Sequence, residues 1–214
     1  MVLSPDSITL PMELNTKVEV IYEEIVFIGP FAESLNKTLT SLDDTMIPST
    51  TTVLPDYFFQ ENENLAAVSL TNVIDIGASE FNSCGITTLS MPNLQTAGMS
   101  SFAYNPMRTV NLPALTEIAT QMFQRCEELV MADFQSVEVI RQRAFYICTN
   151  LEILILRSEN VVELTGTQHF YQTKIESGTG YIYVPSDLVD AYKEDSAWFV
   201  YANQIRSIDE LEVE

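Results

Sequence analysis

The chain contains few of the residues on which catalytic and metal sites depend. Its 214 residues include one His, three Cys, one Trp and seven Gly. The sequence has no glycine-rich phosphate loop, no paired His or Cys at zinc-binding spacing and no acidic calcium loop. The single histidine is His169, and no Ser or Cys lies in a recognisable nucleophile motif. We therefore expect no enzymatic activity, no cofactor and no metal site.

Basic residues are also scarce, with 10 Lys and Arg against 30 Asp and Glu, which gives a formal net charge of −20. A surface of this sign repels nucleic acid and anionic lipid, so we expect neither as a partner. No stretch reaches the roughly 20 apolar residues of a membrane span. Residues 1–6 lack the basic and apolar segments of a secretory signal, which favours a protein of the virion or the cytoplasm over an exported one.

What the chain does contain is a repeat. Phe heads a similar segment five times, at intervals of 22, 21, 21 and 22 residues, and self-similarity at a fixed period predicts stacked structural units. Further apolar columns follow the phenylalanines. The aligned residues are Phe59, Phe81, Phe102, Phe123 and Phe145 in the first column, Leu65, Ile86, Met107, Leu129 and Leu151 in the second, and Val68, Leu89, Val110, Ala132 and Leu154 in the third.

Each segment also carries a short alternation of apolar and polar residues, as in residues 88–91 and 109–112. Alternation with period two indicates a half-buried strand. A unit of this size cannot bury its own apolar side, so we predict a β-rich solenoid with a parallel sheet of about six short strands. The half of each unit headed by Phe then returns on an irregular or short-helical convex side, and a short helical cap closes the C-terminal end.

The full pattern is clearest in two segments, Phe81-x-x-Cys84-x-Ile86-x-x-Leu89-x-Met91 and Phe123-x-x-Cys126-x-x-Leu129-x-x-Ala132-x-Phe134. This pattern resembles the BspA-like branch of the leucine-rich repeats, over residues 56–208. The common leucine-rich repeat places Asn or Cys after its strand, whereas this chain has them three residues after Phe. The resemblance implies a solenoid fold. For function it implies adhesion or protein–protein contact.

The repeat divides the chain into three parts. Residues 1–55 are expected to be a non-repeat cap or an anchoring segment, with strands at 17–22 and 25–28 and with a loop or an eroded first repeat at 36–52. Residues 56–208 form the repeat domain, whose C-terminal cap starts at about residue 181. Residues 209–214 are an acidic tail. Within the cap we predict a sixth strand at 182–184, followed by a short helix at 188–193 that Ser186 and Asp187 cap.

The three cysteines occupy a single repeat column. Cys84, Cys126 and Cys148 alternate there with Asn62 and Asn105. A disulfide between Cys126 and Cys148 is one alternative, because they lie in adjacent units. Parallel side-chain directions and the Asn residues in the same column favour the other, an interior ladder of free thiols.

The outward positions of the predicted strands change along the chain. They are small or polar in the first three units, and large and mostly apolar in the last three. A contiguous apolar patch on a strand face is typical of an interface. We therefore predict a binding patch here, with the alternative that its side chains shield one another or lie beneath residues 163–180. The predicted binding residues are Met131, Ile153, Ile155, Tyr181 and Tyr183.

Together these features predict a non-catalytic binding or assembly module. The expected partner is a protein, either an assembly neighbour or a surface receptor, and a glycan or a second copy of the chain are further candidates. The first setting that we consider is a phage virion, where the protein would serve in structure or host recognition. The alternative is a bacterial cell-surface or secreted adhesin whose export signal has been trimmed or is unconventional.

Overall fold

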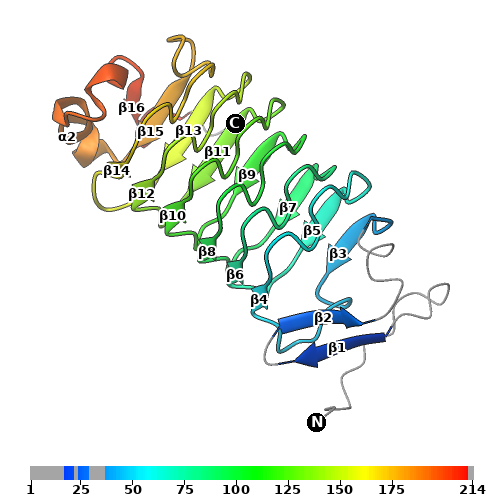
Figure 1. The fold of residues 1–214 in the computed structure, drawn as a ribbon. Coiled ribbons are helices and arrows are strands. Elements are labelled where there is room, and N and C mark those ends of the chain that lie inside the picture. Colours follow the sequence, from blue (N-terminus) through cyan, green and yellow to red (C-terminus); the bar gives the residue numbers. More distant parts are fainter. Residues whose placement is uncertain (1–16, 22–23, 29–36, 212–214) are drawn as a thin grey trace.

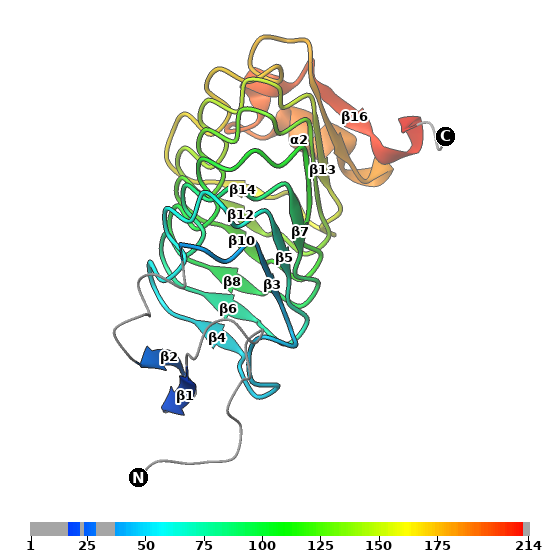
Figure 2. The ribbon, with the colours of Figure 1, turned by 90° about the vertical axis from the view of Figure 1, so that its right-hand side faces the viewer.

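The chain winds into a solenoid of parallel strands, shown in two views in Figures 1 and 2. The computed structural model describes residues 17–21, 24–28 and 37–211. Within these residues every strand pairing outside the N-terminal hairpin is parallel. The predicted fold class is therefore confirmed.

Strands line two sides of each coil, and Figure 2 shows the two sides separately. The long-strand face consists of two parallel ladders, β3-β5-β7 and β9-β11-β13-β15-β16. Its strands are β3 (Ser41–Asp43), β5 (Ala67–Ser69), β7 (Thr88–Ser90), β9 (Thr109–Asn111), β11 (Met131–Phe134), β13 (Ile153–Leu156), β15 (Tyr181–Val184) and β16 (Ile205–Ser207). The short-strand face consists of β4 (Val53–Leu54), β6 (Asp75–Ile76), β8 (Thr96–Ala97), β10 (Glu117–Ile118), β12 (Val139–Ile140) and β14 (Glu163–Leu164).

The third side of each coil is a turn that contains the repeated Phe, and these turns are bonded to one another. The backbone N–H of Phe81 donates to the carbonyl of Ser101 (2.9 Å), and the N–H of Ser83 donates to that of Ala103 (2.9 Å). The same bonds recur between the later turns. The side that we predicted as irregular or short-helical is thus a ladder of turns without helix in the described residues.

A left-handed backbone makes this ladder possible. Among the described residues, twelve that are not glycine have φ between 54° and 62°, and every one lies two residues before or two residues after the repeated Phe. The left-handed conformation costs roughly 1–2 kcal/mol for a residue with a Cβ. The inter-coil hydrogen bonds of the same turns offset this cost. The residues are Tyr57, Glu61, Ser79, Ser83, Ser100, Tyr104, Gln121, Arg125, Arg143, Ile147, Gln168 and Gln172.

The core is a continuous stack of phenylalanine rings. Ring centroids of successive coils lie 5.5–5.8 Å apart with interplanar angles of 6–10°, from Phe59 to Phe170. All six rings are almost completely buried. The phenylalanines aligned in the sequence thus form one buried column, and Phe170 extends it by one coil.

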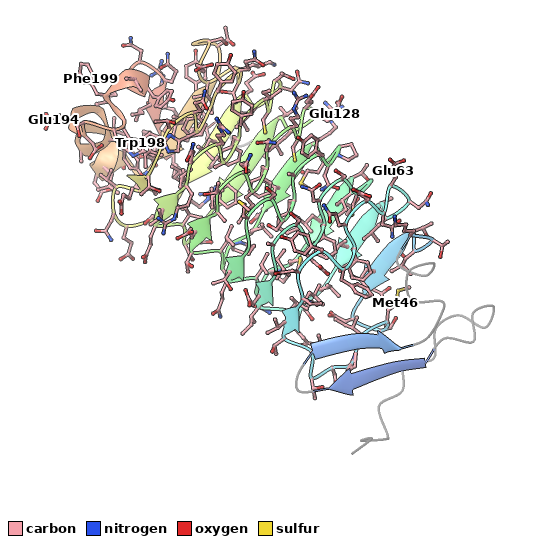
Figure 3. The ribbon with its side chains drawn as sticks, in the orientation of Figure 1. Met46, Glu63, Glu128, Glu194, Trp198 and Phe199 are labelled. Carbon is pink, nitrogen blue, oxygen red and sulfur yellow. The ribbon has the colours of Figure 1, made fainter. Side chains whose placement is uncertain are left out.

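Aromatic residues close the C-terminal end of this core. Trp198 is fully buried, and its Nε1–H donates to the carbonyl of Val162 (2.6 Å), whose own N–H donates to the hydroxyl of Tyr192 (3.0 Å). The predicted helix appears as η1 (Ser186–Leu188) and α2 (Val189–Glu194), followed by η2 (Phe199–Tyr201) and η3 (Ile208–Glu210). The predicted capping by Ser186 and Asp187 is wrong, because Leu188 occupies the N-cap of α2 and no side chain caps it. Figure 3 labels Trp198 and Phe199 in this cap.

At the other end, β1 (Lys17–Ile21) and β2 (Glu24–Ile28) form an antiparallel hairpin, in the place where two strands were predicted. The remaining residues before 37 lie outside the described part of the chain. For residues 36–52 the sequence allowed either a loop or an eroded first repeat. The structure has strand β3 in this segment, and Leu42 of β3 pairs with Val68 of β5. The parallel coil therefore extends N-terminal to residue 56. The role of residues 1–55 as cap or anchor stays a prediction.

Candidate binding surface

The long-strand face presents two rows of outward side chains. Parallel register places Met131 beside Ile153 and Ile153 beside Tyr181 in the first row. In the second row Ile155 lies between Asp133 and Tyr183. The same register continues toward β9, where Thr109 and Asn111 are exposed polar neighbours of the two rows. The five predicted binding residues are thus adjacent in space, on three neighbouring strands.

Their exposure is more limited than an open apolar patch requires. Met131, Ile153, Tyr181 and Tyr183 are half-buried, whereas Ile155 is only 4% exposed. Arg157 covers part of the second row, since its Nε and Nη2 atoms bind the two carboxylate oxygens of Asp133 at 2.8 and 2.9 Å. The outward surface at Ile155 therefore consists largely of the atoms of its neighbours. A partner would contact the first row and Tyr183 directly, with Ile155 beneath them.

One residue of this surface was missed in the sequence. Arg206 pairs with Tyr183 in register, and its guanidinium carbon lies 4.7 Å from the ring centroid of Tyr181. It also donates to two backbone carbonyls, those of Asn203 and Ile205. Strand β16 carries a single apolar residue with no alternation, so no strand signal was available from the sequence. Arg206 places a positive charge at the C-terminal edge of the patch.

Burial also affects the ionisation of the surface. It raises the pKa of the Tyr183 hydroxyl, and the negative charge of Glu210 acts in the same direction. Tyr183 therefore presents a neutral hydroxyl at physiological pH. The adjacent pair Lys174 and Glu152 forms an ion pair of 2.7 Å next to Tyr181, whose N–H donates to the carbonyl of Glu152. The side chains of this surface offer aromatic contacts and hydrogen bonds, with ion pairs beside them.

The interior column of Cys and Asn has a structural role. The thiols of Cys84, Cys126 and Cys148 each donate to the carbonyl of the repeated Phe in the preceding coil, at 2.9–3.2 Å. Asn105 makes the equivalent bond to the carbonyl of Phe81 at 2.7 Å. All three cysteines are free and buried, and burial raises the pKa of each thiol. They are therefore neutral donors in the core.

His169 is likewise held in the interior. It is 6% exposed, and its Nε2 atom lies 2.9 Å from the carbonyl oxygen of Thr165, to which it donates as the Nε2–H tautomer. Burial lowers the pKa of the imidazole. Within the described residues, no group of three or more His, Cys, Asp or Glu side chains is placed to hold a metal ion. The helices of residues 37–211 all fall short of the length and apolarity of a membrane span.

Comparison with known proteins places the repeat in a family. The model of the BspA type leucine rich repeat region matches the chain in six copies, over residues 32–108 and 74–188. No curated protein matches the chain.

Two solved structures are similar in fold. One is described as a leucine rich cell surface protein from Faecalibacterium prausnitzii A2-165, with 19% identity, a TM-score of 0.59, and coverage of 85% of this chain and 55% of that one. The other is a leucine-rich repeat protein from Bacteroides ovatus ATCC 8483, with 20% identity, a TM-score of 0.50, and coverage of 85% and 46%. The chain thus spans about half the length of each of these two structures.

Proposed function

The chain belongs to the BspA-type leucine-rich repeat family, and we propose that it is a non-catalytic module that binds a protein on its long-strand face. The observation that carries this proposal is the change in outward residues along that face. Thr88 and Ser90 of β7 are exposed and polar, whereas Ile153 of β13 and Tyr183 of β15 occupy equivalent positions further along the face. Tyr and Met are enriched at protein interfaces relative to other surfaces.

The interior supports a binding role over a catalytic one. The only histidine and all three cysteines are used in hydrogen bonds to backbone carbonyls within the core. None of them faces the long-strand surface, which therefore has no nucleophile or base of these types. Asp133, the acid on the patch, is neutralised by Arg157.

For the setting, we propose the surface of a bacterial cell. Its support is the structure from Faecalibacterium prausnitzii, whose description is that of a cell surface protein. The virion setting remains a prediction from the sequence, without support from the comparisons. Labelling of intact cells that carry the gene, with an antibody against this chain, tests the choice. Labelling of whole cells is expected, whereas recovery of the protein only with phage particles would contradict the surface setting.

A double substitution tests the binding surface. We expect Ile153→Asp with Tyr183→Asp to leave the solenoid folded, because both side chains are half-buried on the outside of the sheet. The variant should no longer self-associate in light scattering or retain protein partners from extracts of the source cells. The matched control is Thr88→Asp with Ser90→Asp, which adds the same charges to exposed positions on β7. Equal binding by the two variants would show that the predicted patch is not the contact surface.

A further inference from the structure

One buried acid interrupts the regular bonding of the turns. Glu80 precedes Phe81 and is fully buried, and its Oε2 atom accepts the backbone N–H of Phe58 at 2.7 Å. In later turns the N–H of the residue before the repeated Phe donates to a carbonyl of its own turn, as Ser101 does to Gly98 (3.3 Å) and Met122 does to Ala119 (3.1 Å). At the joint between the first two turns, the carboxyl of Glu80 acts as the acceptor for the backbone of the preceding coil.

A second polar group lies in the next coil. Ser101 precedes Phe102 as Glu80 precedes Phe81, and the rings of the two phenylalanines stack 5.8 Å apart. Ser101 and Glu80 are therefore neighbours in one buried column. The Oε1 atom of Glu80 and the Oγ atom of Ser101 are both buried, and neither has a hydrogen-bond partner among the described residues. Each of these atoms needs a partner, because a buried polar group without one is costly, and their place in adjacent coils allows one partner to serve both.

The protonation of Glu80 follows from its surroundings. Burial raises its pKa to about 8, while the N–H groups of Phe58 and Phe59 lower it and the negative charge of Asp56 raises it. Asp56 and the neutral thiol of Cys84 are the titratable groups in the described residues that interact with it electrostatically. No cation pairs with the carboxyl in this part of the chain. Since Oε2 faces an N–H donor, the proton of the neutral acid belongs on Oε1.

We propose that Glu80 and Ser101 form an internal site for one proton and one water molecule, which closes the joint between the first coils while the acid is neutral. The Oε1–H group donates to the water, and the water donates to Ser101 Oγ. Buried waters of this kind commonly satisfy polar groups that the chain itself leaves unpaired. Ionisation of Glu80 removes the donor to the water and leaves a charge in an apolar core.

The pH dependence of stability follows from the sign of this shift. The folded pKa lies above that of the unfolded chain, 4.5, so the folded state binds more protons between 4.5 and about 8. This contribution to stability is complete below 4.5 and is lost as the pH rises through about 8. Glu80→Gln keeps an acceptor for Phe58 and a donor toward the water but cannot ionise.

Two measurements on the full chain test the proposal. First, the urea midpoint of the wild type should fall relative to that of Glu80→Gln between about pH 5 and about pH 9. Parallel pH profiles would overturn the assignment of a neutral Glu80. Second, a high-resolution crystal structure grown below neutral pH should show a water within hydrogen-bond distance of both Glu80 Oε1 and Ser101 Oγ. A direct bond between these atoms, or a site without a water, would overturn the water site.

Coupling between the two residues provides a check in solution. Ser101→Ala removes one partner of the water, so its effect on the urea midpoint should shrink in the Glu80→Leu background, where the other partner is also absent. The matched control is Thr51→Val, which removes a buried hydroxyl that has no partner among the described residues and belongs to a different column. Its effect should be the same in both backgrounds. Full additivity of Ser101→Ala with Glu80→Leu would contradict a shared site.

Discussion

Asn105 offers a direct test of the interior ladder, because its side chain satisfies several groups of two coils at once. Its Nδ2 atom lies within hydrogen-bond distance of the carbonyls of Phe81 (2.7 Å), Phe102 (3.0 Å) and Ala103 (3.2 Å), which share its two hydrogens. Its Oδ1 accepts the N–H of Ile86 (3.1 Å). The residue is 2% exposed, so water cannot replace these bonds freely. Two substitutions separate the contributions, Asn105→Ala and Asn105→Cys.

The magnitudes follow from the groups that each substitution leaves unpaired. Asn105→Ala leaves the N–H of Ile86 without its acceptor and the carbonyl of Phe81 without its inter-coil donor. Each of the two buried groups costs about 1–3 kcal/mol, so we expect a loss of about 2–6 kcal/mol in the free energy of unfolding. Asn105→Cys introduces the donor that Cys126 and Cys148 already use at this column. It should restore the bond to Phe81 but not the one from Ile86, for a loss of about 1–3 kcal/mol.

Urea unfolding of the full chain, followed by circular dichroism, measures both losses. The order wild type, Asn105→Cys, Asn105→Ala is the expected one, with similar m-values because the folded coils are retained. An effect of Asn105→Cys as large as that of Asn105→Ala would show that a thiol cannot replace the amide donor at this column. A negligible effect of Asn105→Ala would refute the role of these bonds in holding the coils together.

Two further predictions concern the thiols and the turns. Burial raises the pKa of Cys84 and Cys126 to about 12, so the thiols of the folded protein should resist alkylation at pH values where urea-unfolded chains react. The stability of the protein should also fall as the pH rises above 9.0, where unfolded thiols ionise. Rapid alkylation of the native protein would contradict this prediction. Arg125 is exposed and left-handed, with φ of 55°, and Asn tolerates this conformation, so Arg125→Asn should raise the free energy of unfolding by about 0.5–1 kcal/mol. The control, Arg108→Asn, changes an exposed residue without positive φ and should not raise it. Equal effects of the two substitutions in thermal unfolding would rule out backbone strain as the cause.

The repeat could be predicted from the sequence because its most regular positions are buried. Phe81, Phe102 and Phe123 stack on one another, so each must be large, flat and apolar, and the period is visible without any structure. For residues 36–52 the sequence left a loop and an eroded first repeat as alternatives, because the apolar columns of the later units are not visible there. Strand β3 of this segment has one buried apolar residue, Leu42, and Leu42 is recognisable only through its pairing with Val68.

The left-handed turns and the exposure of the patch could not be predicted, for a different reason. Gly and Asn are the usual signals of positive φ, but Gln121, Arg143 and Ile147 carry it here because inter-coil bonds hold the turn. Ile155 pairs in register with Tyr183 of the outward row, yet it is only 4% exposed. Exposure on a stacked sheet depends on residues some twenty positions away in the chain, and no local pattern contains them.

The division between inside and outside determines where specificity can evolve in this fold. Each interior column admits few residue types, since a ring must stack on a ring and a donor must reach a Phe carbonyl. The outward rows have no such requirement, and they change from Ala67 and Ser69 on β5 to Tyr181 and Tyr183 on β15 while the backbone register is kept. A substitution on these rows can therefore alter a partner contact at little cost to the coil. Sequence comparison among relatives should accordingly examine the outward rows, because the interior columns report only on the stacking and hydrogen bonding of the coils.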